Sequence, residues 1–344
     1  MRQVILLFLL FPTIIYGQNN YSFSSKKTFK KAESEMLAGK TDEALVLFKT
    51  VVLEEPGFSE AYLSMSKIEL SKNNYKKSLE YAKKALKNNK VQYSIYSQVG
   101  KSYFSLNDFD SSSHYFYLAM LYGANEASDF YVLAKSENNQ KSFKKALKNI
   151  NIAIEKNNSI SNYYVVKGNA YFGELNFDKA KSSYEKALEL NPKQSNLYSS
   201  LAGVELENDN LEEALKNINK GAELAKGNEK ITFFLLKGNY FKKLGELDNA
   251  EQEFNKAFDI DPNNTSTLIN QSAIMIKKGE YENAVEKCSE IIDIDGSRSE
   301  AYFNRGIANE MLKNTDEACS DWEEAFIMGS TKAEEFINSP TCNE

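Results

Sequence analysis

Small residues return every 34 residues along this chain, and this spacing constrains the fold more than any other feature. The step is constant from Ala44 to Ala214, lengthens once to 36 residues, and is 34 again from Ala250 onward. Nine small residues so spaced cannot share one compact core, so the sequence predicts nine copies of one repeat stacked in a row. They are Ala44, Ser78, Ser112, Ala146, Ala180, Ala214, Ala250, Ala284 and Ala318.

Each repeat is numbered so that this small residue is position 20, which makes the repeats begin near residues 25, 59, 93, 127, 161, 195, 231, 265 and 299. Position 8 is small in every repeat, and position 4 is aromatic in seven of them. Because residues at i, i+4 and i+7 share a helix face, positions 4, 8 and 11 predict one helix, and positions 20, 24 and 27 predict a second. Small residues at positions 8 and 20 allow the two helices to approach closely.

The predicted helices also have recognisable ends. Glycine or asparagine at position 15 of five repeats predicts a left-handed residue after the first helix. Proline at position 32 of three repeats is expected to stop the second helix. These residues are Gly39, Asn73, Asn107, Gly245 and Gly279 at position 15, and Pro56, Pro192 and Pro262 at position 32.

This pattern resembles the tetratricopeptide repeat (TPR) family over residues 25–330. The resemblance implies an all-α fold, a right-handed α-solenoid superhelix of about nine helix–turn–helix repeats. The first repeat departs from the family pattern at Thr28 and Glu35, and the second and fourth have Glu69 and Glu137 at position 11. The fifth repeat matches best, with Tyr164, Gly168, Tyr171, Ala180, Tyr184, Ala187 and Pro192.

Two places interrupt the regular pattern. The step of 36 residues places two extra residues within Ala225–Lys230, where Gly227 is suited to end a helix, so we expect a bend or a boundary there. After the last repeat, residues 331–344 predict an amphipathic capping helix and a tail, which would cover the apolar face of the final repeat. The stretch Ala318–Gly329 resembles the closing repeat of exported TPR proteins from the Bacteroidetes group.

The N-terminus predicts export. Arg2 precedes an apolar run from Val4 to Tyr16 that ends at the small residue Gly17. This order is typical of a secretory signal peptide, here residues 1–17, followed by a short segment of residues 18–24. The expected location is therefore the periplasm or cell envelope. A retained N-terminal anchor is the alternative, and membrane attachment is expected only in that case.

Charge and motifs argue against several functions. The formal net charge is −6, both signs are interspersed, and the sequence has no evident basic stripe. Nucleic acid is therefore not an expected partner. The single histidine, His114, has no second metal ligand near it in sequence, and no phosphate-binding loop or nucleophile elbow is present. We expect no enzyme activity, no catalytic or metal-binding residues and no cofactor.

Three cysteines are too few for a disulfide scaffold. Cys288 stands at a packing position and is expected to be buried. Cys319 and Cys342 would form a disulfide if the capping helix folded back, but the sequence does not determine their separation. Paired and free thiols therefore both remain open at this stage.

The resemblance also implies where a partner would bind. In TPR proteins the first helix of each repeat lines a concave groove, with positions 2, 5, 6, 9, 12 and 13 toward the ligand. We therefore predict a protein–protein interaction scaffold that binds a protein or peptide; a sugar-binding or envelope-polysaccharide assembly factor is the alternative, because groove aromatic rings can stack on sugars. An asparagine ladder for a peptide backbone and a merely solvated groove both remain open. The candidate residues are Phe104, Tyr131, Lys135, Asn169, Phe172, Asn239, Asn270, Phe303 and Asn304.

Overall fold

The computed structural model describes residues 21–339 and Cys342. Within them every regular element is helical, which confirms the predicted all-α, TPR-like solenoid fold. The described residues form two compact units, one ending at Gln140 and one beginning at Lys141. We call the first helix of each repeat its A helix and the second its B helix. The helices of the N-terminal unit are α1 (Phe23–Leu37), α2 (Thr41–Glu54), α3 (Ser59–Ser71), α4 (Tyr75–Asn88), α5 (Tyr93–Ser105), α6 (Phe109–Leu121) and α7 (Ala127–Asn139).

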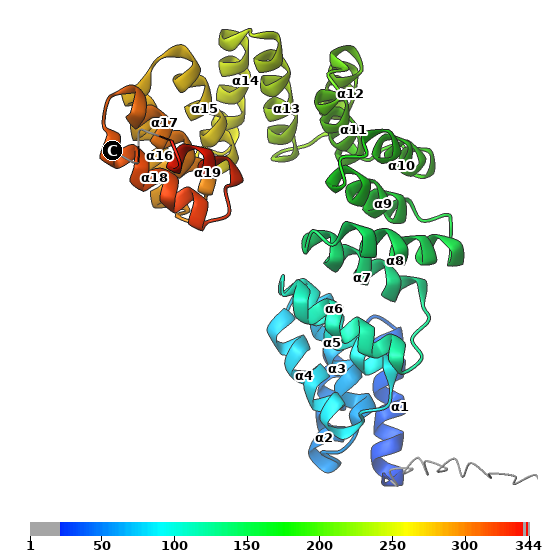
Figure 1. Cartoon of the computed structure of the whole chain (residues 1–344). Helices are drawn as coiled ribbons and strands as arrows, with labels where there is room; N and C mark the ends of the chain where they lie inside the picture. Colours follow the sequence, from blue (N-terminus) through cyan, green and yellow to red (C-terminus); the bar gives the residue numbers. More distant parts are fainter. Residues whose placement is uncertain (1–20, 340–341, 343–344) are drawn as a thin grey trace, which may run out of the picture. The chain divides into compact units, whose positions relative to one another are not determined.

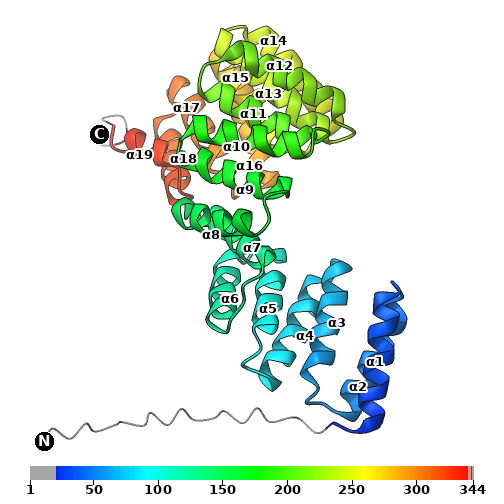
Figure 2. The same cartoon turned by 90° about the vertical axis from the view of Figure 1, so that its right-hand side faces the viewer.

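The C-terminal unit continues the same alternation of A and B helices. Within each unit consecutive helices form antiparallel pairs (Figures 1 and 2). Its helices are α8 (Phe143–Lys156), α9 (Ser161–Gly173), α10 (Phe177–Leu190), α11 (Ser195–Glu207), α12 (Leu211–Leu224), α13 (Glu229–Leu244), α14 (Leu247–Ile260), α15 (Thr265–Lys278), α16 (Tyr281–Ile294), α17 (Ser299–Met311), α18 (Thr315–Ile327) and α19 (Thr331–Ile337).

Close approach of the A and B helices gives each repeat its core. Gly168 lies against the ring of Tyr184, and a Cβ added to that glycine would be 2.5 Å from the ring. Gly238 has the same relation to Phe254, at 2.2 Å. The nine small residues at position 20 are all fully buried. The predicted role of small residues at positions 8 and 20 is therefore the one they have in the structure.

The helices end where the sequence predicts, and the left-handed residue after the A helix occurs in more repeats than predicted. All five glycine and asparagine residues at position 15 have positive φ, and so do the four other residues at that position. Each predicted proline lies two residues beyond the end of a B helix. A left-handed backbone is strained for most residues other than glycine, so other residue types do not predict it. The left-handed conformation at the remaining four positions therefore could not be predicted from the sequence. These four residues are Lys141, Leu175, Asp209 and Lys313.

Several buried polar side chains inside the stack form hydrogen bonds with other side chains. Ser78, which replaces alanine at position 20, shares a hydrogen bond of 2.7 Å with Ser102 of the next repeat. The position 11 glutamates are buried as well: Glu69 accepts a hydrogen bond of 2.7 Å from Asn74, and Glu205 accepts one of 2.8 Å from Asn210. Buried polar groups are tolerated when hydrogen-bonded, so these departures from the family pattern are part of the packing.

The step of 36 residues lengthens one helix. Helix α13 begins at Glu229, two residues before the first position of its repeat, and Gly227 ahead of it has a φ of +51°. The extra residues therefore lie in the predicted stretch. The boundary between the two compact units, however, lies between Gln140 and Lys141 and not within residues 225–230. Helices α12 and α13 instead pack on each other within one unit, where Tyr198, Ala225 and Phe233 share a cluster.

The C-terminal helix covers the last repeat, as expected. Ala333 of α19 is fully buried, and Phe336 packs on Trp322 with ring centroids 4.8 Å apart. A disulfide joins Cys319 of α18 to Cys342, with Cα atoms 5.6 Å apart. Cys288 is free and buried, and burial raises the pKa of its thiol to about 11.

At the other end, Tyr21 stacks on Phe58 with ring centroids 4.1 Å apart, which fixes the chain at the start of α1. The predicted signal peptide, residues 1–17, lies outside the described residues. Among the residues that are described, no helix has the length and apolar character needed to cross a bilayer.

Two glycine substitutions test the helix packing. We expect Gly238→Ala to lower the free energy of unfolding by about 1–3 kcal/mol, because the new methyl group collides with the ring of Phe254. Gly203→Ala is the matched control: it lies within helix α11, and its added Cβ would meet nothing within 4 Å. It should stabilise by about 0.5–1 kcal/mol. Urea unfolding followed by circular dichroism measures both, and equal stability of the two variants would contradict the packing model.

A thiol count tests the disulfide. Mature protein from an oxidising compartment, denatured without reductant, should react with a thiol reagent at Cys288 alone and at all three cysteines after reduction. Three reactive thiols before reduction would exclude the disulfide.

Candidate binding surface

A helices of neighbouring repeats lie side by side at several places in both units, and we call the surface that they form the layer of A helices. In the N-terminal unit α3 contacts α5 and α5 contacts α7, so successive A helices lie side by side. In the C-terminal unit α11 contacts α13, and α15 contacts α17. The predicted groove residues all belong to A helices, so this layer is the surface on which to compare them.

Three of the predicted residues come together in the N-terminal unit. The Nζ atom of Lys135 lies 4.7 Å from the ring centroid of Phe104 and 5.5 Å from that of Tyr131. Phe104 also packs edge-on against Phe109, at 5.6 Å between centroids. Burial lowers the pKa of Lys135, whose ammonium group is held mainly by the faces of these rings. The sequence prediction therefore named the three members of one aromatic–cationic cluster.

Two further lysines on this layer were missed. Lys67, Lys101 and Lys135 all occupy position 9, on α3, α5 and α7, and we call them the lysine row. Lys67 retains contact with solvent, yet burial and then the charge of Lys101 lower its pKa, whereas Glu33 raises it. The 34-residue spacing of these lysines was readable in the sequence. The spacing was overlooked because other charged residues lie between these three lysines along the chain.

Lys101 is the one member of the row with an ion-pair partner among the described residues. Its Nζ lies 3.2 Å from Oδ1 of Asp129, a buried carboxylate that also accepts a hydrogen bond of 2.8 Å from Ser97. Lys67 and Lys135 form no ion pair within residues 21–339. The row thus carries two unpaired cations beside one that is neutralised.

An apolar pocket of about 430 Å³ lies on α1 in the same unit. Phe29 and Phe58 stack within it, with centroids 4.8 Å apart, and the side chain of Phe23 is 84% exposed. Glu33 also lines the pocket, and its negative charge acts to raise the pKa of Lys67. The remaining lining residues are the lysines Lys26, Lys27 and Lys30.

In the C-terminal unit several predicted groove residues form hydrogen bonds or ring contacts with other residues of the same unit. Asn169 accepts a hydrogen bond of 2.7 Å from the hydroxyl of Tyr184, and Phe172 packs against Phe177 at 5.5 Å. Asn304 donates to the hydroxyl of Ser272 at 3.0 Å. These contacts give each side chain a structural role inside its own unit.

Phe303, another predicted groove residue, lies under the capping helix. Its ring meets Phe336 of α19 edge-on, with centroids 5.2 Å apart. Sequence reasoning placed the capping helix correctly but did not foresee that it would cover this position. Phe303 is therefore part of the C-terminal core cluster.

Asn239 and Asn270 lie beside a second group of cations. The Oδ1 atom of Asn239 is buried and has no hydrogen-bond partner among the described residues. Asn270 donates to the carbonyl oxygen of Ser266 at 2.9 Å and accepts a longer bond of 3.4 Å from Nζ of Lys242. Burial, then the charges of Lys277 and Lys332, lower the pKa of Lys242. No continuous asparagine ladder is formed by these contacts.

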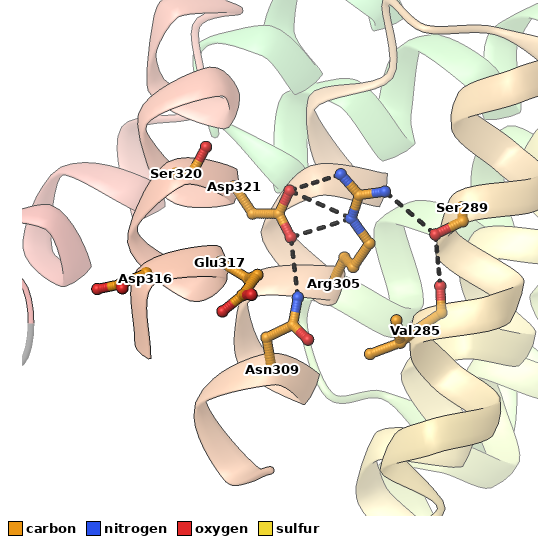
Figure 3. A pocket seen from close by; sticks show the side chains of 8 residues that line it. All are labelled: Val285, Ser289, Arg305, Asn309, Asp316, Glu317, Ser320 and Asp321. Atoms are coloured by element: carbon orange, nitrogen blue, oxygen red, sulfur yellow. Dashed lines mark hydrogen bonds and ion pairs between the residues drawn. The ribbon is translucent and has the colours of Figure 1, made fainter. Parts of the chain in front are cut away.

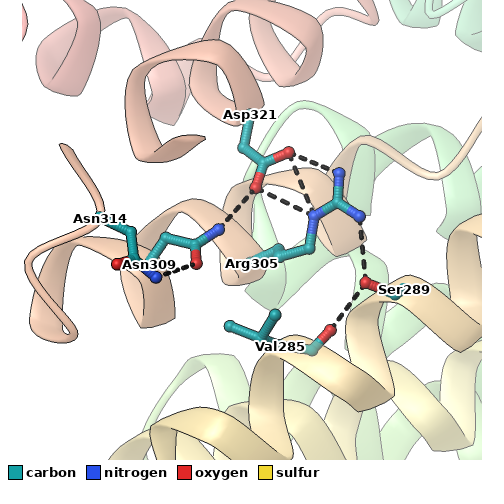
Figure 4. Close-up of polar contacts among 6 residues, drawn as sticks. All are labelled: Val285, Ser289, Arg305, Asn309, Asn314 and Asp321. Atoms are coloured by element: carbon teal, nitrogen blue, oxygen red, sulfur yellow. Dashed lines mark hydrogen bonds and ion pairs between the residues drawn. The ribbon is translucent and has the colours of Figure 1, made fainter. Parts of the chain in front are cut away.

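The largest of the described pockets, about 500 Å³, lies between α16, α17 and α18 (Figure 3). Its centre is Asp321, which is 5% exposed and accepts hydrogen bonds from Arg305 at 2.7 and 3.0 Å and from Asn309 at 3.2 Å. Arg305 also donates to Ser289 at 3.1 Å, and Ser289 donates to the carbonyl of Val285 (Figure 4).

The two ionisable groups of this network, Arg305 and Asp321, are hydrogen-bonded to each other. Hydrogen bonding to Asp321 raises the pKa of Arg305, so the guanidinium keeps its proton, and the carboxylate of Asp321 is occupied by hydrogen bonds from Arg305 and Asn309. The network ties α16, α17 and α18 together. Elsewhere, His114 is exposed and meets Tyr115 edge-on at 5.4 Å. No group of three or more His, Cys, Asp or Glu side chains suited to a metal occurs in the part of the chain that the structure describes.

Comparison with known proteins identifies the repeats. Tetratricopeptide repeat models match residues 59–91, 161–194 and 231–264, so the chain contains TPR repeats. No curated protein matches the sequence. A TPR protein from Parabacteroides merdae is similar in structure over 74% of this chain and 100% of its own, with a TM-score of 0.57 and 14% identity, which shows a shared fold.

Two other solved structures are similar over shorter stretches. Pseudomonas aeruginosa PilF matches 61% of this chain and 96% of its own, with 17% identity and a TM-score of 0.48. MamA from Desulfovibrio magneticus matches 48% of this chain and 94% of its own, with 20% identity and a TM-score of 0.46.

The Arg305 network can be tested for a structural role. Arg305→Ala should lower the free energy of unfolding by about 3 kcal/mol, because it leaves the carboxylate of Asp321 buried and unpaired. Replacing both residues with leucine should recover much of the loss. Lys84→Ala, which removes an exposed ion pair with Glu80, is the control and should cost no more than about 0.5 kcal/mol. If all three proteins unfold at the same urea concentration, the network does not hold these helices together.

Proposed function

We propose that this chain is an exported, non-enzymatic scaffold of the cell envelope that binds a protein or peptide partner on the layer of its A helices. TPR repeats support protein–protein interaction in general. The groove, the partner and the envelope setting are parts of the proposal. A stack of helix pairs offers a long surface, and no helix has to move to expose it.

The observation that carries the proposal is the cluster of Phe104, Tyr131 and Lys135. Aromatic rings and a desolvated cation are the groups that contribute most to protein interfaces when a partner covers them. All three side chains are only partly buried, so part of each remains accessible. They project from two successive A helices, which suits a partner that runs across the repeats.

The absence of catalysis is supported by the chemistry of the largest described pocket. Its buried carboxylate, Asp321, is paired with Arg305. The single histidine, His114, is exposed and contacts the ring of Tyr115. Export is supported by the composition of residues 1–17 and by the Cys319–Cys342 disulfide, which suits an oxidising compartment. No observation favours the sugar-binding alternative.

Capture from envelope extract tests the function. The mature chain should retain a defined protein, identified by mass spectrometry, and Phe104→Ala with Tyr131→Ala should reduce the retained amount at least about tenfold through loss of aromatic contact area. The matched control is Val46→Ala with Leu53→Ala, which removes two exposed apolar side chains from the B helix α2. Circular dichroism confirms that each double variant is folded.

Equal retention by both double variants would contradict binding at this surface. Retention of glycan without any protein would favour the sugar-binding alternative over this proposal.

A further inference from the structure

The lysine row places one ammonium group on each of three neighbouring helices. Lys67, Lys101 and Lys135 share position 9 of α3, α5 and α7, and α5 contacts both of its neighbours. The charges of Lys67 and Lys101 affect one another, which agrees with this adjacency. The chain as a whole is acidic, with a formal net charge of −6, so a row of cations on one face is a local departure from its overall charge.

Neither end of the row is neutralised by the fold. Lys67 and Lys135 make no ion pair among residues 21–339; Lys135 is half-buried, whereas Lys67 is exposed. A partly desolvated charge without a counter-ion costs free energy, and an incoming carboxylate would recover it. Asp129 is committed to Lys101 and Ser97. Glu33 is the other carboxylate whose charge acts on the row, and it acts at the Lys67 end.

The pocket on α1 lies at this same end. Glu33 lines the pocket and occupies position 9 of α1, the position that the row occupies in the next three repeats, so the pocket lies at the Lys67 end of the row. The pocket volume of about 430 Å³ exceeds that of any single side chain, and stacked aromatic rings line it. Phe23 and the lysines of α1 complete its lining. An apolar side chain placed there would be covered by rings and flanked by cations.

From this arrangement we propose that the N-terminal unit binds an extended acidic segment of a protein partner, whose carboxylates meet Lys67 and Lys135, on either side of the neutralised Lys101, and whose terminal apolar side chain enters the pocket on α1. The inference rests on the proposed function and adds the chemistry of the partner. Charge complementarity favours aspartate and glutamate side chains. Contacts on three helices favour an extended segment over a compact one.

An anionic membrane surface would also be attracted to lysines, but the geometry favours a peptide. The ammonium group of Lys135 lies between helices and against the faces of two rings. Single carboxylate side chains of an extended peptide can approach such a half-buried ammonium group. A planar layer of lipid headgroups would first meet the exposed outer side chains instead.

Fluorescence anisotropy with a labelled synthetic peptide tests the proposal. The probe has phenylalanine at both ends and glutamate at alternate positions between them, and its companion has glutamine in place of every glutamate. The acidic peptide should bind the mature chain at least about tenfold more tightly than its glutamine companion, and the difference should shrink at high ionic strength. Replacing both phenylalanines of the probe with alanine should weaken binding at least about fivefold.

Matched variants locate the site. Lys67→Gln with Lys135→Gln should weaken the acidic peptide at least about tenfold. Lys76→Gln with Lys77→Gln removes the same charge from the B helix α4 and should change affinity less than about twofold. Phe23→Ser alters the pocket at a side chain that is 84% exposed, so it should weaken the probe without unfolding the chain.

Three results would overturn the inference: equal affinity for the two peptides, equal losses in the two lysine double variants, or binding to vesicles of phosphatidylcholine and phosphatidylglycerol that needs Lys67 and Lys135 while the peptide does not bind. The proposed function fails separately. If the aromatic double variant still abolishes capture of the natural partner while the acidic peptide does not bind, the scaffold function stands and the acidic chemistry is wrong.

Discussion

The stack depends on complementary volumes at position 8 of each A helix and position 24 of the B helix that follows. Where position 8 is glycine, position 24 is an aromatic ring, and a Cβ on that glycine would come within 3.0 Å of the ring. Where position 8 is serine, position 24 is small, as in Ser66 with Ala82 and Ser272 with Cys288. A close-packed interior demands this compensation, because neither a void nor an overlap is tolerated. The glycine pairs are Gly100 with Phe116, Gly168 with Tyr184, Gly238 with Phe254 and Gly306 with Trp322.

This compensation separates the residues that build the stack from those available for binding. The position 9 side chains take no part in it, and Lys67 and Lys135 have no ion-pair partner among the described residues, although Lys135 is half-buried. Such residues contribute little to folding and impose some cost. Their presence at one position of successive repeats is therefore easier to explain by a partner than by the fold. The buried network of Arg305 and Asp321 has the opposite character, because each group satisfies the other.

Periodicity made most of the fold predictable, since each repeat restates the same packing rule. The helices, five of the left-handed helix ends and the capping helix all follow from it. Leu175 and Lys313 end helices in the left-handed conformation without any residue preference that would reveal it. Family positions marked Phe104, Tyr131 and Lys135 as candidate groove residues, but they did not predict that the three side chains meet. The pocket on α1 was not predicted, because Phe58 reaches it from the loop between α2 and α3 and no local pattern connects Phe58 with α1.

The first and last described repeats differ in how far their apolar faces are covered. A stack of repeats leaves one apolar face open at each end, and these faces are normally covered. At the C-terminal end α19 covers Trp322, and a disulfide between Cys319 and Cys342 holds the end of the chain there. At the start of α1, Tyr21 covers part of Phe58, but Phe23 remains exposed beside an apolar pocket. An apolar pocket that the described residues leave open, at the end of a row in which Lys67 has no ion-pair partner among those residues, is a surface on which a partner can gain both kinds of contact at once.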